Sequence, residues 1–207
     1  SSDVCSSDLE GVYEKILDAA KKEFLSKGFR DASLRVIARE ADTSTSSIYT
    51  RFNDKQGLFD AIIQPVGDEY VEMFTKIQEQ FWQMESYDDY DYMLEYSENG
   101  QKMLLDYIYE HFDEFQLLLC QADEVQKDRF MNTLIDIETK GSLEYLDVMQ
   151  PKQRVDEEFM HIVNTAFFNG FFEIVHHKMD REKAYQYITR LRAVYNAGYA
   201  TVYDAEF

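Results

Sequence analysis

The sequence is short of residues that interrupt helices or cross-link loops. Only two prolines and eight glycines occur among 207 residues, which favours long uninterrupted helices. Cys5 and Cys120 are the only cysteines, and they have no CxxC spacing, so we expect a reducing, cytoplasmic setting and an inert core thiol at Cys120. The longest apolar run, 167–175, is interrupted by Asn, Gly and Glu and is shorter than the roughly 18 residues of a membrane span. The sequence therefore favours an all-α fold without a membrane segment.

Motifs for catalysis and metal binding are also missing. The sequence contains no GxSxG, no phosphate-binding loop, no GxGxxG and no HExxH. The four histidines have no metal-ligand spacing, and the adjacent His176 and His177 point to different faces of a helix. The many carboxylates are typical of a solvated surface. We therefore expect no catalytic residue, no cofactor and no metal site.

The chain begins with SSDVCSSDL, in which SSD occurs twice. This stretch has neither a basic segment nor an apolar segment of the kind found in signal peptides. We expect residues 1–9 to be a non-native lead and exclude them from the fold.

Charge is distributed unevenly along the chain. The overall formal charge is −19, which by itself argues against a nucleic-acid partner. Residues 10–62, however, hold nine basic and nine acidic side chains, whereas residues 63–207 hold 12 basic and 29 acidic ones, a net charge of −17. This asymmetry predicts two domains with separate tasks, one at 10–63 and one at 64–207.

The neutral domain contains short helical patterns. Apolar residues recur every three to five positions over Val12–Ser26, which indicates an amphipathic helix that Gly28 ends. Ser33 is a good N-cap for a second helix over Leu34–Glu40. The apolar residues Leu34, Ile37, Ala38 and Ala41 fall on one face of this second helix, and a short break at Asp42-Thr43 follows.

The stretch TSTSSIYTRF, residues 43–52, supplies the third helix. Ser44 can cap it, and Ile48 and Phe52 can form its buried side. Asn53 can cap a fourth helix, with Gln56 at the N3 position. Two short helices joined by a tight turn form a helix-turn-helix, and the exposed hydroxyls of the second helix can approach phosphates and base edges closely.

The segment "ILDAAKKEFLSKGFRDASLRVIAREADTSTSSIYTRFNDKQGLFDAII" resembles the DNA-binding domain of the tetracycline-repressor (TetR/AcrR) family. The resemblance rests on features in the same order: Gly28-Phe29, Ile37-Ala38, Ile48-Tyr49-x-x-Phe52 and Lys55. It implies a three-helix DNA-binding domain at 10–63 and a helical effector-binding and dimerisation domain at 64–207. The family's usual Gly-Val before the recognition helix is replaced by Asp42-Thr43, and Asp can adopt the left-handed turn at modest cost.

The helix-turn-helix predicts the DNA contacts. Lys55 is placed at a helix N-terminus, where a cation is unfavourable unless a phosphate docks, although it could be an ordinary solvated lysine. Tyr49 can pack as a core aromatic or reach a phosphate, and the arginines could equally be solvated. The candidate DNA-binding residues are Ser33, Arg35, Ser44, Thr45, Ser46, Ser47, Tyr49, Thr50, Arg51 and Lys55.

The acidic domain reads as helical throughout. The expected helices are Gly57–Met84, Tyr87–Tyr96, Asn99–Glu110, Asp113–Gln121, Lys127–Met149, Asp156–Lys178 and Arg181–Tyr203. All eight methionines and the single tryptophan lie after residue 63, where they can fill a core or line an adaptable ligand pocket. The candidate pocket residues are Met103, Tyr107, Phe112, Leu118, Met131 and Phe168. Acidic and aromatic side chains favour a lipophilic cation over an anion as the ligand.

Small residues in the last two helices allow close helix approach, either within the chain or across a two-fold interface. The candidate interface residues are Ala166, Gly170, Phe171, Ala193, Ala197 and Ala200. Together with the resemblance, the sequence predicts a cytoplasmic homodimeric repressor that binds a palindromic operator of double-stranded DNA and is released by a small-molecule effector. The alternative is a ligand-binding protein or enzyme that has kept a vestigial helix-turn-helix.

Overall fold

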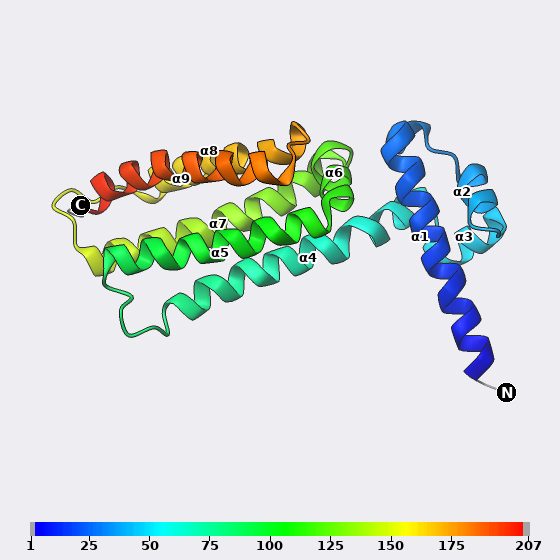
Figure 1. Ribbon diagram of the computed structural model, residues 1–207, viewed down its shortest axis with the longest axis horizontal. Coiled ribbons are helices and arrows are strands. Elements are labelled where there is room, and N and C mark those ends of the chain that lie inside the picture. The colour runs from blue at the N-terminus through cyan, green and yellow to red at the C-terminus, as the bar shows by residue number, and fades with distance from the viewer. Residues whose placement is uncertain (1–2, 205–207) are drawn as a thin grey trace. The chain divides into compact units, whose positions relative to one another are not determined.

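The computed structural model describes residues 3–204, with side chains from residue 11 onward, and all of its regular elements are helices (Figure 1). In order they are α1 Asp3–Asp31, α2 Leu34–Glu40, α3 Thr45–Phe52, α4 Lys55–Phe81, α5 Tyr90–Glu110, α6 Phe112–Cys120, α7 Glu124–Met149, α8 Glu157–His176 and α9 Arg181–Tyr203. The all-α prediction is confirmed. Within the described part of the chain, no helix is long and apolar enough to cross a lipid bilayer.

The chain divides into two compact units. The first takes in the described residues up to Asp68 together with His111–Asp123, and the second takes in Glu69–Glu110 and the described residues from Glu124 onward. Helix α4 contributes residues to both units. Helix α6 thus belongs to the first unit although α5, which precedes it in the sequence, belongs to the second.

The first unit is built on the apolar face of α1. Ile16, Ala20 and Phe24 are fully buried, as the spacing of the first helix predicts. The ring of Phe24 packs edge-on against Phe59 of α4 at 5.1 Å. Lys21 of α1 also forms an ion pair of 2.8 Å with Glu114 of α6. These contacts fix α1 and the start of α4, between which α2 and α3 lie in the sequence.

The helix bounds agree with several predictions and differ from others. The bounds of α2 and α9 are those predicted, and α3 follows Ser44 as expected. Helix α1 begins at Asp3, inside the stretch excluded from the fold, and Gly28 has non-helical dihedral angles, φ 79° and ψ 161°, near its end. The break expected between Tyr96 and Asn99 does not exist, because α5 runs through both segments. Cys120 is exposed rather than an inert core thiol.

The second unit consists of long helices that pack lengthwise. Helix α7 contacts α8, α8 contacts α9, and α9 contacts α5. Figure 1 shows these helices running alongside one another. Its interior includes polar groups that are paired: the buried Asn164 donates to the hydroxyl of Thr139 at 3.2 Å and accepts from the hydroxyl of Tyr199 at 2.5 Å. This chain of hydrogen bonds ties α7, α8 and α9 together in one register.

Candidate nucleic-acid interface

A tight turn joins α2 to α3. The backbone N–H of Thr43 donates to the carbonyl of Ala38 at 2.9 Å, and that of Asp42 donates to Arg39 at 3.2 Å. This pair of bonds closes a helix C-terminus when the residue after the cap is left-handed, and Asp42 has φ 51°. The prediction that Asp42 adopts the left-handed turn is confirmed. The turn thus forms without the glycine that would adopt it most easily.

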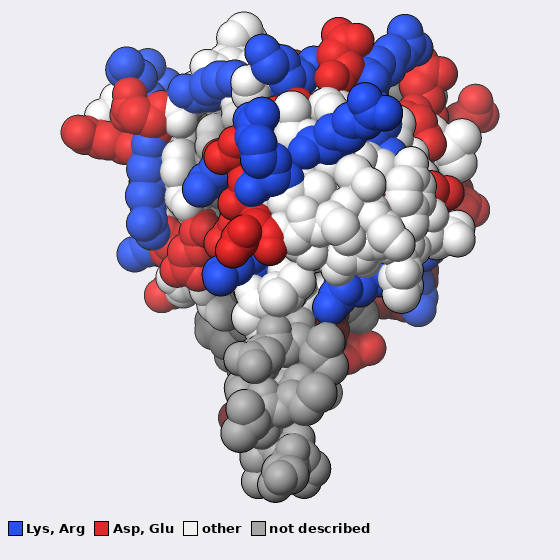
Figure 2. All heavy atoms as spheres, turned by 90° about the vertical axis from the view of Figure 1, so that its right-hand side faces the viewer, with Lys and Arg blue, Asp and Glu red and all other residues white. Residues whose placement is uncertain are grey.

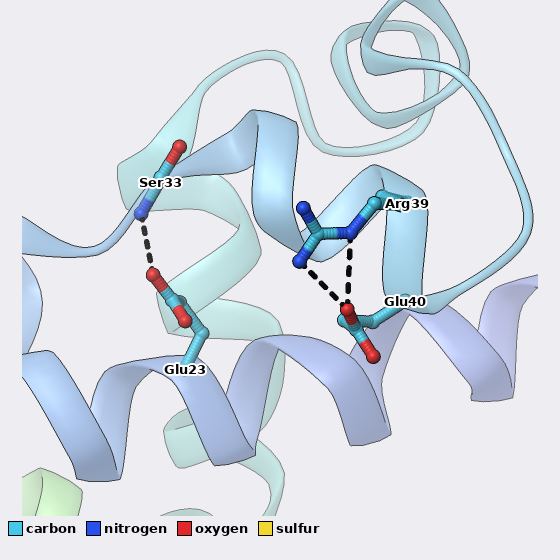
Figure 3. Close-up of polar contacts among 4 residues, drawn as sticks. All are labelled: Glu23, Ser33, Arg39 and Glu40. Carbon is cyan, nitrogen blue, oxygen red and sulfur yellow. Dashed lines mark hydrogen bonds and ion pairs between the residues drawn. The ribbon is translucent and has the colours of Figure 1, made fainter.

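The start of α2 is held by a side chain from α1. Ser33 occupies the N-cap position, as predicted, but its side chain makes no capping hydrogen bond. Instead, the backbone N–H of Ser33 donates to Glu23 Oε1 at 3.1 Å (Figure 3). Figure 3 also shows the ion pair of 2.9 Å between the neighbouring Arg39 and Glu40 at the other end of α2. The carboxylate of Glu23 therefore sets the position of α2 relative to α1, a contact that the sequence pattern did not reveal.

Helix α3 is anchored by its apolar side and exposes the other. Ile48 and Phe52 are buried, as predicted, and the ring of Phe52 stacks on Tyr13 of α1 at 5.2 Å. Tyr49, by contrast, is 53% exposed. The alternative of Tyr49 as a core aromatic is wrong. Its ring and hydroxyl are available to an external partner.

The hydroxyls of α3 fall into two groups. Ser44 accepts from the N–H of Ser47 at 3.1 Å and so caps the helix, as predicted. The Ser47 hydroxyl accepts from the Arg51 guanidinium, and the Thr50 hydroxyl donates back to the Ser46 carbonyl at 2.9 Å.

The hydroxyls of Thr45 and Ser46, in contrast, make no hydrogen bond to any residue of the described chain, 3–204. Both residues lie in the first turn of α3. They are the hydroxyls of this helix with full hydrogen-bonding capacity for a partner.

Lys55 makes contacts within the first unit. Its ammonium group donates to the carbonyl oxygens of Arg30 at 2.9 Å and Ala32 at 3.2 Å. It also lies 5.0 Å from the centre of the Phe29 ring. Two of its three N–H donors therefore hold the segment that leads into α2, and one remains for another acceptor.

The junction between α3 and α4 differs from the predicted capping. Asn53 does not cap α4; it is the C-cap of α3, with φ 68°. The side chain of Asp54 takes the capping role and accepts from the N–H of Gly57 at 2.8 Å. A Cβ atom at Gly57 would lie 2.0 Å from the carbonyl oxygen of Phe52, so this position requires glycine.

Charged side chains surround an uncharged area on the face that Figure 2 presents. Lys and Arg side chains border this area, and acidic side chains are interspersed among them (Figure 2). Arg35 of α2 is exposed and could contribute a phosphate contact. A mixed charge of this kind supplies local phosphate contacts without a strongly positive field.

Comparison with known proteins identifies this segment. Residues 16–62 match the family model of bacterial regulatory proteins, tetR family. This segment is a helix-turn-helix domain of the tetR-family type. It is 38% identical over 50 residues to YvkB, an uncharacterized HTH-type transcriptional regulator of Bacillus subtilis, and 33% identical over 58 residues to the HTH-type transcriptional regulator SrpR of Pseudomonas putida. These alignments cover 24% and 28% of this chain and only 26% and 27% of those two proteins.

Solved structures of transcriptional regulators share the fold over nearly the whole chain. A TerR/AcrR-family transcriptional regulator from Aquifex aeolicus has a TM-score of 0.58 at 19% identity, covering 90% of this chain and 98% of that one. The fatty acid degradation regulator FadR from Bacillus halodurans has a TM-score of 0.57 at 18% identity, covering 94% of this chain and all of that one (100%). The likeness in fold therefore extends to the second unit as well as to the helix-turn-helix.

The second unit contains a cavity of about 110 Å³. Of the six candidate pocket residues, only Phe168 lines it. Tyr107 and Met131 are buried elsewhere in the second unit, and Met103 is 56% exposed. Phe112 and Leu118 lie on α6, in the first unit. The structure thus does not bring the predicted pocket residues together.

The candidate interface residues also separate into two groups. Phe171 and Ala200 are buried inside the second unit, and Gly170 faces α9, where the Tyr187 hydroxyl donates to its carbonyl at 2.8 Å. Ala166, Ala193 and Ala197 are exposed. Large apolar residues on the same two helices, Ile162 and Val194, are 60% and 71% exposed. The exposed surface of α8 and α9 therefore includes large apolar residues that the small-residue pattern did not select, in addition to three alanines that it did.

Sequence reasoning also missed Glu138, which lines the cavity. A signal for it exists in the sequence. The buried face of α7 includes Leu134, Ile135, Ser142 and Tyr145, and Glu138 falls at the same helical spacing. A carboxylate on an otherwise buried helical face needs an explanation, because burial of an ionised group is costly.

No group of three or more His, Cys, Asp or Glu residues that could hold a metal ion occurs within the described part of the chain.

Proposed function

We propose that this tetR-family regulator is a cytoplasmic homodimeric repressor that binds a palindromic operator and leaves it when an effector binds. The observation that carries the DNA-binding part is the first turn of α3. Thr45 and Ser46 keep free hydroxyls there, and Tyr49 is exposed on the same short helix. Short hydroxyls permit close approach to base edges, and a tyrosine hydroxyl can reach the adjacent phosphate.

Dimerisation is needed because residues 10–62, which contain the helix-turn-helix, have no net charge. Residues 10–62 have as many acidic as basic side chains, and the rest of the chain is strongly acidic. A neutral unit gains little from counterion release, so one copy alone binds weakly. Two copies held about 34–36 Å apart, one helical turn of DNA, can place both recognition helices in successive major grooves.

The exposed apolar residues of α8 and α9 support the dimer. Phe159, Ile162 and Ala166 follow one another at helical spacing on α8, and Val194 and Ala197 do so on α9. Contiguous exposed apolar surface is typical of protein interfaces. Two copies of this surface can bury each other in a symmetric arrangement.

The experiment is a DNA-binding titration with the fragment upstream of the protein's own gene. We expect saturable binding to a palindrome in that fragment, weakened by Ser46→Ala and by Tyr49→Phe. Ile162→Glu should give a monomer in sedimentation and weaken binding, because a charge placed in an apolar interface prevents association. Thr201→Ala, an exposed position on α9, is the control.

Absence of sequence-specific binding, with the protein folded and dimeric, would favour the alternative of a ligand-binding protein or enzyme with a vestigial helix-turn-helix. A mutated palindrome that binds equally well would lead to the same conclusion. Both measurements use the protein without an effector.

A further inference from the structure

The cavity of the second unit combines aromatic walls with one carboxylate. Residues of α4, α5, α7 and α8 line it, together with Tyr203 of α9. The walls include the rings of Phe74, Phe81 and Trp82. Among the described residues that line it, none is Lys, Arg or His, and Glu138 is the one ionisable carboxylate. The cavity therefore contains an ionisable carboxyl group without a basic neighbour in its wall.

Glu138 is held in place by one neutral hydrogen bond. Its Oε2 atom accepts from Gln78 Nε2 at 2.6 Å. Burial raises the pKa of the Glu138 carboxyl to about 7, and the Gln78 hydrogen bond opposes this only in part. Gln78 reaches this position because α7 has a glycine opposite it: a Cβ at Gly141 would lie 2.9 Å from Gln78 Oε1. The carboxyl group thus lines the cavity without a cationic partner and is ionised once the pH exceeds about 7.

Two more polar atoms in the wall make no hydrogen bond within the described chain. They are the hydroxyl oxygen of Tyr145, whose side chain is nearly completely buried, and Oε1 of Gln101. A buried polar atom without a partner is costly, and a ligand that supplies one removes the cost. Gln101 Oε1 and ionised Glu138 can only accept, whereas the Tyr145 hydroxyl can do either. The cavity therefore calls for a ligand that donates.

A basic side chain that lines an adjoining cavity is already paired. A smaller cavity of about 70 Å³ shares Glu138, Gln101 and Tyr203 with the first and is also lined by Arg192. Arg192 forms an ion pair of 2.5 Å with Glu98. It is not a member of the wall of the larger cavity and does not lower the pKa of the Glu138 carboxyl. An anionic ligand in the larger cavity would meet Glu138 without a compensating cation.

We propose that the effector is a hydrophobic amine that binds with its ammonium group at Glu138, within reach of Gln101 and Tyr145, and its apolar part between the aromatic rings. A protonated amine supplies both the positive charge and several N–H donors. The rings of Trp82 and Tyr145 add attraction for a cation that has left water. The effector role of the amine rests on the proposed function, because it requires that the protein bind DNA. Binding of the amine to the cavity is measured without DNA.

Trp82 provides the readout. It is the only tryptophan in the chain and it lines the cavity, so its fluorescence reports occupancy of this site. The probes are phenethylamine, phenethyl alcohol and phenylacetate, which share an aromatic ring and differ in charge. We expect phenethylamine to bind at least about tenfold more tightly than the alcohol at pH 8, and phenylacetate to bind more weakly than the alcohol. Equal binding of amine and alcohol, or tighter binding of phenylacetate, would overturn the proposal.

Variants separate the charge from the shape of the cavity. Glu138→Gln keeps the size of the side chain and should lower phenethylamine affinity at least about tenfold, while leaving the affinity for the alcohol unchanged. Glu144→Gln removes the same charge from an exposed position of α7 and should change neither affinity. If Glu138→Gln binds phenethylamine as tightly as the unaltered protein, the ammonium group does not pair with Glu138. Circular dichroism of both variants verifies that the helices are intact.

A second measurement keeps this inference distinct from the proposed function. Phenethylamine is added to the protein bound to its own promoter fragment. Release of DNA by the amine, lost in Glu138→Gln, supports the effector role. Binding at Trp82 without DNA release contradicts that role, even though the ligand class of the cavity is then established. Failure of the protein to bind DNA at all contradicts the proposed function alone.

Discussion

The ammonium nitrogen of Lys55 lies 2.9 Å from the carbonyl oxygen of Arg30, so the first residue of α4 is joined to the end of α1. The same group donates to Ala32 and lies over the ring of Phe29. A lysine at a helix N-terminus is electrostatically unfavourable, and these acceptors offset that cost. The contact gives Lys55 a structural task in addition to the phosphate contact predicted from the sequence.

The first prediction concerns this contact. Lys55→Ala should lower the free energy of unfolding by roughly 1–2 kcal/mol, because two charge-assisted hydrogen bonds are lost at a partly exposed site. If the third N–H donor also binds a phosphate, the slope of log K against log salt concentration should fall by about one unit. Urea unfolding measures the first effect and a salt titration of DNA affinity measures the second.

Lys27→Ala is the control for both measurements, because Lys27 is an exposed residue of α1. Its unfolding free energy should be unchanged. A Lys55→Ala protein with unaltered stability would show that the hydrogen bonds to Arg30 and Ala32 contribute nothing. An unaltered salt slope would remove Lys55 from the DNA contacts.

The second prediction distinguishes the hydroxyls of α3. Ser46→Ala removes a free hydroxyl and should change base preference at a few operator positions by roughly 1–3 kcal/mol if a good base contact is lost. Ser47→Ala removes the acceptor of Arg51 and should therefore act through the position of the Arg51 side chain. Binding-site selection from a random library measures both preferences. The same selected operator for the unaltered protein and Ser46→Ala would place specificity elsewhere, such as in DNA shape.

The helix-turn-helix could be predicted from the sequence because its signals are local. Ser44, Ile48 and Phe52 define α3 by capping and helical spacing alone, and their roles are confirmed. Lys55 shows the limit of such reasoning, since its acceptors lie on Arg30 and Ala32, more than 20 positions away. A helix-start pattern cannot reveal an acceptor on another element.

The cavity was harder to predict because it is lined by residues of five helices that meet only in the fold. Met103 and Tyr107 share the apolar composition of pocket residues, yet one is exposed and the other is buried away from the cavity. Composition identifies candidates for burial but not which face of each helix borders an empty space. Glu138 was identifiable in principle, because a charge on a buried helical face is unusual.

The third prediction tests the turn before α3. Asp42 has φ 51°, a backbone conformation that costs free energy in a residue with a Cβ atom. Glycine, which has no Cβ atom, adopts it without this cost. Asp42→Gly should therefore raise the free energy of unfolding by a few tenths to about 1 kcal/mol, whereas Asp42→Ala should lower it. Urea unfolding of the three proteins provides the comparison. If Asp42→Ala is as stable as Asp42→Gly, the left-handed conformation is not what limits this turn.

The fourth prediction concerns Gly57. A methyl group at this position would meet the carbonyl oxygen of Phe52 at 2.0 Å, which requires the backbone between α3 and α4 to move. Gly57→Ala should destabilise the first unit by roughly 3 kcal/mol or more and weaken DNA binding. Gly11→Ala is the matched control, because nothing lies within 4 Å of its added Cβ, and it should be neutral or stabilising. Equal stability of the two variants would contradict the packing of this junction.

The last prediction follows from the ionisation of Glu138. Burial raises the pKa of its carboxyl from 4.5 to about 7 in the folded protein, so the folded state binds more protons than the unfolded state between these values. The free energy of unfolding must then decrease as pH rises from about 5 to 8, by up to roughly 2–3 kcal/mol from this group. Burial raises the pKa of Tyr199 and Tyr203 as well, so both neighbouring phenols stay neutral in this range.

Glu138→Gln cannot ionise and should lose this contribution. The free energy of unfolding of this variant should lie close to that of the unaltered protein near pH 5 and exceed it near pH 8. Urea unfolding between pH 5 and 8 measures both. The exposed Glu144→Gln removes one charge from the same helix and should follow the unaltered protein at every pH, which separates burial from the general repulsion among carboxylates. Parallel pH profiles for Glu138→Gln and the unaltered protein would mean that the carboxyl titrates near its ordinary value. A hydrophobic amine should stabilise the unaltered protein at pH 8, because pairing with the ionised Glu138 carboxylate favours the folded state. It should therefore reduce the difference in unfolding free energy between the unaltered protein and Glu138→Gln.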